Sequence, residues 1–245
     1  MKLRTISALT LAATSLFAAS SAMAWESEDG QHSTSATVGL FSDYLFRGIS
    51  FTSEDPAIQG SFDYAHSSGL YAGIWASNLA SFDGEDNTIE IDGYAGFANE
   101  FGDTGIGYDV SVVRYFYPGT GETNSDYNEY FASLSYSYFT AMIGYTPEWA
   151  GDDKIDETYY NLSFDYELPY GIAFNAAVGY TDSDRNDGTA GAADSYVDYT
   201  IGLSKPFVGL DWSVAYVGTN SDGEDFAATD SAADDRFLVS VSKSF

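Results

Sequence analysis

Apolar side chains recur at every second position along most of this chain, and connections of alternating length join the runs that carry them. The clearest example lies between residues 57 and 79. Ile58, Phe62 and Tyr64 alternate there with polar or small residues, and Leu70 and Ile74 resume the pattern after a turn. A β-strand places successive side chains on opposite faces. Each run is therefore predicted to be a strand with one apolar face and one polar or small face.

We count twelve such runs between residues 34 and 245, the first over residues 34–47 and the last over residues 236–245. Short turns such as 102–105 and 168–171 alternate with long loops such as 117–126, 181–194 and 218–235. This alternation of connection lengths persists to the end of the chain. It indicates an antiparallel up-and-down sheet, and it constrains the fold more than any single strand does.

Two closed architectures fit these strands: a soluble β-sandwich or barrel, and an outer-membrane barrel. Many of the apolar faces end in Tyr, with Gly, Ser and Ala opposite, which fits apolar faces that point outward. Tyr rings near strand ends form the aromatic girdles of membrane barrels, whose turns are short at the periplasmic end and long outside. We predict an all-β fold, a transmembrane antiparallel β-barrel of twelve strands in the cell outer membrane.

The two ends of the chain support this location. Lys2 and Arg4 precede an apolar stretch and a small-residue cleavage site at residues 22–24, which is typical of a secretory signal peptide. The predicted organisation is a signal peptide over residues 1–24, a flexible segment over 25–33 and a barrel over 34–245. The chain ends on an alternating pattern that resembles the signal for barrel assembly, although Lys243 departs from it: Phe237, Val239, Val241 and Phe245. The expected partners are the barrel-assembly machinery, outer-membrane lipid and lipopolysaccharide.

Composition narrows the classes of ligand. Removal of residues 1–24 leaves seven basic residues against 37 acidic ones, a formal net charge of −30. Such a surface repels nucleic acid and attracts cations, although a saline habitat would favour the same acidity. The chain has no Cys and two His. Disulfides and thiolate sites are thereby excluded, two His do not favour a His-rich metal site, and we predict no cofactor and no dedicated metal site.

One stretch resembles a known family. Residues 43–50 (DYLFRGIS), 55–60 (DPAIQG), 62–66 (FDYAH) and 69–73 (GLYAG) are similar to the TorF-type porin family of exported proteobacterial proteins. The match is most specific over residues 43–79, and later segments agree in layout more than in motif. The resemblance implies an outer-membrane barrel with a pore role. It supplies no solute and no catalytic residues.

An enzyme is the rival class. Outer-membrane phospholipases also use twelve strands and need a Ser–His pair at the outer rim, whereas His66, Ser67 and Ser68 fall in a short turn. Short turns lie at the periplasmic end of such barrels, so this pair is at the wrong leaflet for a lipase. The geometry of a catalytic base is judged before its pKa, and we therefore predict no enzyme. Residues 182–188 are rich in Asp, as a calcium-binding loop is. At positions six and twelve, however, where an EF-hand loop has Gly and Glu, this chain has Asp187 and Ala193. We favour a solvated acidic surface there over loose bridging of the loops by Ca²⁺ or Mg²⁺.

Strand parity places an acidic set on the face opposite the apolar one. Arg47 is the basic residue that joins this set, and it is expected to pair with Asp43, four residues away. Carboxylates inside a narrow barrel concentrate cations. We predict a porin-like channel for passive diffusion of ions and small solutes that is selective for cations. The alternative is a non-conducting barrel whose acidic external loops bind a partner or divalent cations. The predicted pore-lining residues are Asp43, Arg47, Asp63, Glu90, Asp92, Asp109, Glu129, Asp165, Asp198 and Asp211.

Overall fold

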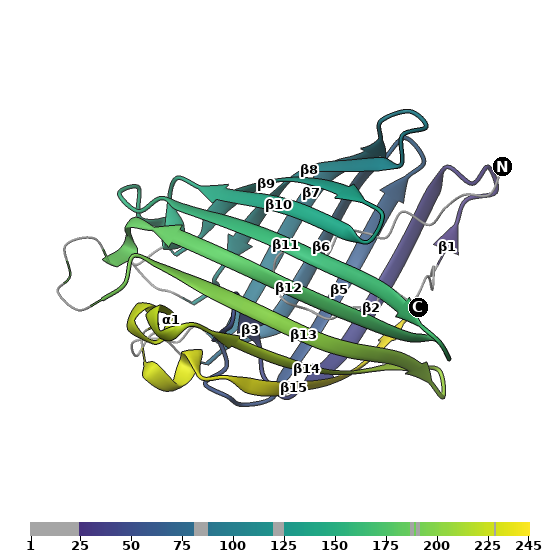
Figure 1. Ribbon diagram of the computed structural model, residues 1–245. Helices are drawn as coiled ribbons and strands as arrows, with labels where there is room; N and C mark the ends of the chain where they lie inside the picture. Colours follow the sequence, from purple (N-terminus) through teal and green to yellow (C-terminus); the bar gives the residue numbers. More distant parts are fainter. Residues whose placement is uncertain (1–24, 81–87, 120–124, 187–188, 190–191, 228) are drawn as a thin grey trace.

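The computed structural model describes residues 25–80, 88–119, 125–186, 189, 192–227 and 229–245, and it forms a barrel (Figure 1). Each strand pairs antiparallel with the next in sequence, and β15 pairs with β2 to close the ring, with Val241 opposite Leu40. The predicted fold class, a closed antiparallel barrel of twelve strands, is confirmed. Its strands are β2 (His32–Phe41), β5 (Ala57–His66), β6 (Leu70–Asn78), β7 (Ile89–Glu100), β8 (Ile106–Phe116), β9 (Tyr127–Tyr136), β10 (Phe139–Thr146), β11 (Glu157–Leu168), β12 (Ile172–Ser183), β13 (Ser195–Phe207), β14 (Leu210–Thr219) and β15 (Arg236–Ser244).

The faces of the strands are arranged as in a membrane barrel, with apolar side chains outside. On β5, Ile58 is 56% exposed, whereas its neighbour Gln59 is 3% exposed and points inward. On β14, Val214 is exposed and Ala215 is buried. A closed barrel satisfies every backbone group within the sheet, which is what a lipid environment requires. Among the described residues no helix is both long enough and apolar enough to cross a membrane.

The connections fall into two sets, which define the two ends of the barrel. The turn end carries the short connections, such as residues 67–69 and 208–209, and the loop end carries the long ones. The loop between β14 and β15 contains α1 (Ser221–Phe226) and a 3₁₀ helix, η3 (Asp230–Ala233). The other two 3₁₀ helices, η1 (Trp149–Gly151) and η2 (Asp184–Asn186), also lie in loops of the loop end.

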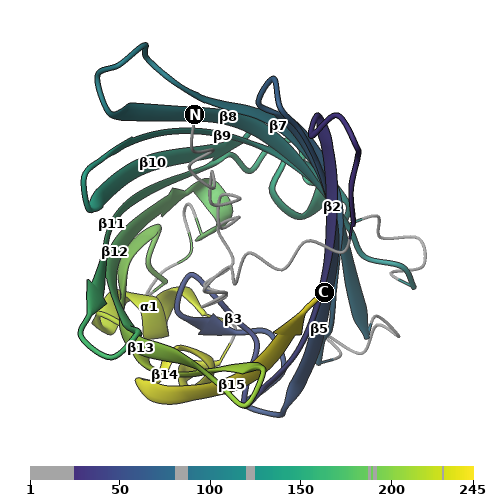
Figure 2. The ribbon, with the colours of Figure 1, turned by 90° about the vertical axis from the view of Figure 1, so that its right-hand side faces the viewer.

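The first strand is shorter than predicted. It ends at Phe41 instead of Arg47, and a small hairpin of β3 (Leu45–Phe46) and β4 (Ile49–Ser50) follows. Arg47 and Gly48 have φ angles of 51° and 82°. These left-handed conformations cannot continue a strand, so the chain turns back on itself. Seen along the barrel, the hairpin lies inside the ring of strands (Figure 2).

The N-terminal segment also forms part of the sheet. Residues 25–33, expected to be flexible, include β1 (Trp25–Glu26), which pairs with β2 so that Trp25 lies opposite Thr34. The predicted signal peptide, residues 1–24, lies outside the described residues.

One turn glycine provides a test of the barrel register. Gly69 has a φ angle of 101°, and a Cβ atom added there would collide with the carbonyl oxygen of Ala98 on β7. We expect Gly69→Ala to lower the free energy of unfolding by more than about 2 kcal/mol, because the backbone strain and the collision add. Gly102→Ala is the control: its φ is 55° and the added atom has no neighbour within 4 Å, so the cost is about 1 kcal/mol. Urea unfolding of the barrel in lipid vesicles measures both. Equal losses would contradict the collision.

Candidate functional site

The interior of the barrel is buried toward the loop end and accessible toward the turn end. The inward face of β11 shows the gradient: Glu157 and Tyr159 are buried, Asn161 and Ser163 are half-buried, and Asp165 is exposed. β13 repeats it, from buried Asp198 through half-buried Ser204 to exposed Pro206. The interior is therefore polar and accessible at the turn end, a region here called the vestibule, and it is packed near the loop end.

The packed region is formed by the β3–β4 hairpin and its flanking residues 42–56, here called the plug loop. Tyr44, Leu45 and Phe46 are each less than 10% exposed and belong to one apolar cluster with wall residues. The Tyr44 ring lies 5.3 Å from the ring of Trp75 on β6, and the Phe46 ring lies 6.3 Å from that of Tyr115 on β8. The plug loop thus fills the outer part of the interior.

A second apolar cluster joins the plug loop to the loop between β14 and β15. Ile49 of β4 packs with Tyr196 of β13 and with Phe226 and Ala233 of that loop. The Tyr196 and Phe226 rings lie 4.7 Å apart. Two loops of the loop end therefore cover the interior together.

Arg47, at the tip of the plug loop, crosses the interior to two carboxylates of the wall. Its Nη1 donates to Glu157 Oε1 at 2.5 Å, and its Nη2 pairs with Glu129 Oε1. The guanidinium also lies over the ring of Tyr159, 4.1 Å from its centroid. Burial alone would lower the pKa of Arg47, but Glu129 and then Glu157 raise it well above its ordinary value. Arg47 is therefore a fully buried guanidinium whose charge is balanced by two carboxylates of the wall.

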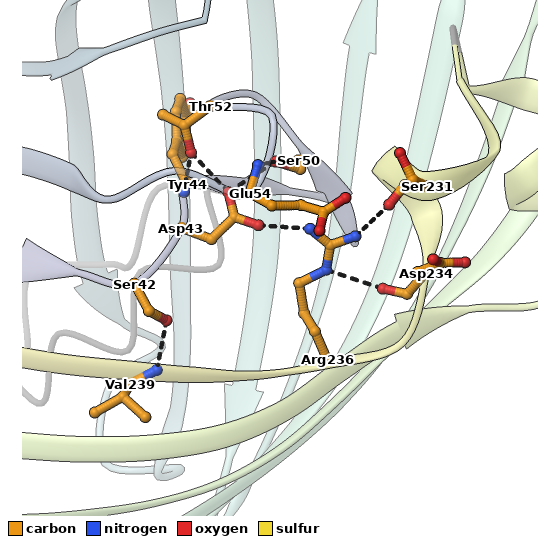
Figure 3. Close-up of polar contacts among 10 residues, drawn as sticks. All are labelled: Ser42, Asp43, Tyr44, Ser50, Thr52, Glu54, Ser231, Asp234, Arg236 and Val239. Atoms are coloured by element: carbon orange, nitrogen blue, oxygen red, sulfur yellow. Dashed lines mark hydrogen bonds and ion pairs between the residues drawn. The ribbon is translucent and has the colours of Figure 1, made fainter.

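Asp43 holds the base of the plug loop (Figure 3). Its Oδ2 accepts a hydrogen bond of 2.7 Å from Arg236 Nη1 at the start of β15, and its Oδ1 accepts from the hydroxyls of Ser50 and Thr52 at 2.7 Å each. Arg236 also donates to the backbone oxygens of Asp234 and Ser231. The predicted pair between Arg47 and Asp43 is therefore wrong. It assumed a continuous strand, and the strand ends before both residues.

The predicted pore-lining residues divide into two groups. The strand members all lie on inward-facing positions, as parity indicates. Glu90, Asp92, Glu129 and Asp198 are buried beside the plug loop. Nearer the turn end, Asp165 is exposed, Asp63 and Asp211 are half-buried, and Asp109 is buried under the hydroxyl of Tyr71 at 2.9 Å. The hydroxyl of Tyr94 similarly donates to Asp63.

Two charged residues of the interior escaped the sequence analysis. Glu157, the first residue of β11, shares inward parity with Asn161, Ser163 and Asp165 but was not included in the predicted set. Arg236, the first residue of β15, is only 14% exposed and points inward to Asp43. The tyrosines that point inward were also missed, because tyrosine was considered only as a girdle residue on the outward face.

The interior carries an excess of negative charge. Within the described residues, the ion pairs of the buried carboxylates use two guanidinium groups, those of Arg47 and Arg236. Glu90 and Asp92, two residues apart on β7, have no ion pair there, and each has one carboxylate oxygen without a hydrogen-bond partner. Buried carboxylates without partners are costly. They are the groups most ready to accept a cation or water.

The turn residues considered for catalysis make only local contacts. His66 Nδ1 accepts a hydrogen bond from the backbone N–H of Ser68 at 3.1 Å and lies 2.8 Å from its hydroxyl. This is ordinary turn bonding at the turn end. Across the part of the chain that the structure describes, no three His, Cys, Asp or Glu side chains are grouped to hold a metal ion. Part of the acidic segment 182–188 lies outside the described residues.

Comparison with known proteins supports this description. A family model described as a bacterial protein of unknown function (Gcw_chp) matches residues 26–245. A KdgM porin structure aligns with a TM-score of 0.55 at 9% identity, covering 86% of this chain and 99% of that one. A NanC porin structure gives 0.54 at 9% identity, covering 85% and 97%. No curated protein matches the chain. The shared fold and the apolar exterior are those of a transmembrane β-barrel.

Proposed function

We propose that this chain, which belongs to the Gcw_chp family of bacterial proteins of unknown function, is a porin of the TorF type that conducts ions and small solutes and prefers cations. In this proposal solutes enter the polar vestibule at the turn end and pass the plug loop when it moves aside. The fold it shares with small porins supports a pore role by analogy.

The observation that carries the proposal is the excess of carboxylates on the inward wall. Five carboxylates are buried on the inward wall, and the guanidinium of the plug loop pairs with two of them: Glu90, Asp92, Glu129, Glu157 and Asp198. A low-dielectric wall strengthens the field of such charges. Cations are therefore concentrated in this passage and anions are repelled.

The reversal potential across a bilayer with a KCl gradient tests the selectivity. We expect a cation-selective potential that moves toward zero in the variant Glu90→Gln, Asp92→Asn, Glu129→Gln, because three inward charges are lost. The control is Asp152→Asn with Asp153→Asn, which removes exposed charges of a loop and should leave the potential unchanged. An anion-selective wild type, or a triple variant that behaves as the wild type does, would contradict the proposal.

The packed plug loop favours one alternative, a non-conducting barrel whose acidic external loops bind a partner or divalent cations. In that case the plug loop is a permanent part of the core. The two functions separate on one observation, which is whether the refolded wild-type chain, with its plug loop in place, conducts in a planar bilayer.

A further inference from the structure

The residues that hold Arg47 belong to the barrel wall, whereas Arg47 belongs to the plug loop. We propose that Glu129, Glu157 and Tyr159 form a binding site for guanidinium-bearing solutes, and that Arg47 occupies this site as a tethered ligand. The inference rests on the proposed channel function, because the ligand would be a solute that enters the barrel. It identifies a chemical class of solute for that channel.

The wall residues are fixed independently of the plug loop. Glu129 lies on β9 and is held by a hydrogen bond of 2.9 Å from the Tyr115 hydroxyl on β8, a strand that pairs directly with β9. Glu157 and Tyr159 lie on β11, two residues apart on the inward face. Because these strands are ordered by the barrel ladder, the site keeps its shape when Arg47 leaves.

The geometry matches the chemistry of a guanidinium. Its two terminal nitrogens meet carboxylates from two different strands, and its central carbon lies 4.1 Å from the centroid of an aromatic ring. A planar cation with donors in a fixed fork uses all three groups together, whereas an ammonium ion presents a single point charge. The wall is therefore more complementary to a guanidinium than to other cations.

The tethered ligand leaves part of the site unused. Arg47 Nε and Asp198 Oδ2 are both buried and have no hydrogen-bond partner within the described residues. The Tyr159 hydroxyl, which belongs to the site, contacts the other carboxylate oxygen of Asp198 at 3.3 Å. A free guanidinium, which has no backbone constraint, can turn toward this third carboxylate. Solute and Arg47 therefore compete for one site.

The test is rescue of the vacant site. In Arg47→Ala the tethered ligand is removed, and the refolded barrel in detergent is titrated with ethylguanidinium by calorimetry. We expect saturable binding with a dissociation constant on the order of millimolar. Ethylurea, which has a similar shape without the charge, should not bind. Adding Glu129→Gln and Glu157→Gln should weaken ethylguanidinium binding by about tenfold or more.

If Arg47→Ala does not refold, a second variant without the tethered ligand can be used for the same titration. Replacing residues 43–55 with a short linker also empties the site, because Phe41 and Ala57 are paired neighbours across β2 and β5. Absence of saturable binding, equal binding of ethylurea, or binding that is insensitive to the Gln changes would overturn the site. If the barrel binds ethylguanidinium but never conducts, the binding site is supported and the channel function is rejected. If it conducts but does not bind, the channel function is supported and the binding site is rejected.

Discussion

Replacing residues 43–55 with a linker of about four residues is expected to raise the mean conductance of the refolded barrel by about tenfold or more. The plug loop fills the outer part of the interior with Tyr44, Leu45 and Phe46. The strands do not depend on it, because Phe41 and Ala57 already pair at the rim. Planar-bilayer recording at fixed salt measures the change.

A matched control retains the plug loop and removes charge from its exposed part. Glu54→Gln with Asp55→Asn alters two exposed residues of the same segment and should conduct as the wild type does. If the shortened barrel refolds with the usual heat-modifiable migration and still does not conduct, the non-conducting alternative is correct.

The second large effect concerns Arg47 as the anchor of the plug loop. Ser50 is 3% exposed and the chain has no Cys, so a Ser50→Cys chain reports loop release through the labelling rate of its thiol. Arg47→Ala in this background leaves Glu129 and Glu157 buried without their cation. We expect labelling to accelerate by about a hundredfold, since breaking a buried pair on one side costs about 3 kcal/mol.

Arg114→Ala is the control for this measurement. Arg114 forms a partly exposed ion pair with Asp126 at 3.7 Å, and such a pair contributes about 0–1 kcal/mol. Its loss should change the labelling rate by less than about threefold, because it does not touch the plug loop. Equal acceleration by the two changes would mean that Arg47 is not the anchor.

The sequence predicted what depends on local periodicity. Alternation and connection length gave twelve strands and the inward set of carboxylates, because parity follows from backbone geometry alone. It failed at residues 42–47, where Tyr44 and Phe46 continue the alternation of β2 although the strand has ended. The left-handed backbone angles at Arg47 and Gly48 do not change the pattern of apolar residues, so periodicity could not reveal the turn there.

Ion pairs between residues that are far apart in the chain were the other feature that the sequence could not predict. Arg47 meets residues 82 and 110 positions away in the chain, and Arg236 meets one 193 positions away. No spacing rule within the sequence connects such residues, since they become neighbours only when the barrel closes. Asp43 was accordingly assigned to the nearest basic residue, which was the wrong one.

The same separations lead us to expect an order of events during folding. The plug loop leaves the chain between β2 and β5, but its anchors lie on β9, β11 and β15, and β15 is the last strand to be made. Contacts of such high sequence separation form late, after the chain entropy of closing the ring has been lost. We therefore expect the barrel to close around water, and its carboxylates to lose that water only afterward, when the plug loop packs into the interior. No buried charge of this interior has to pass through lipid on its own.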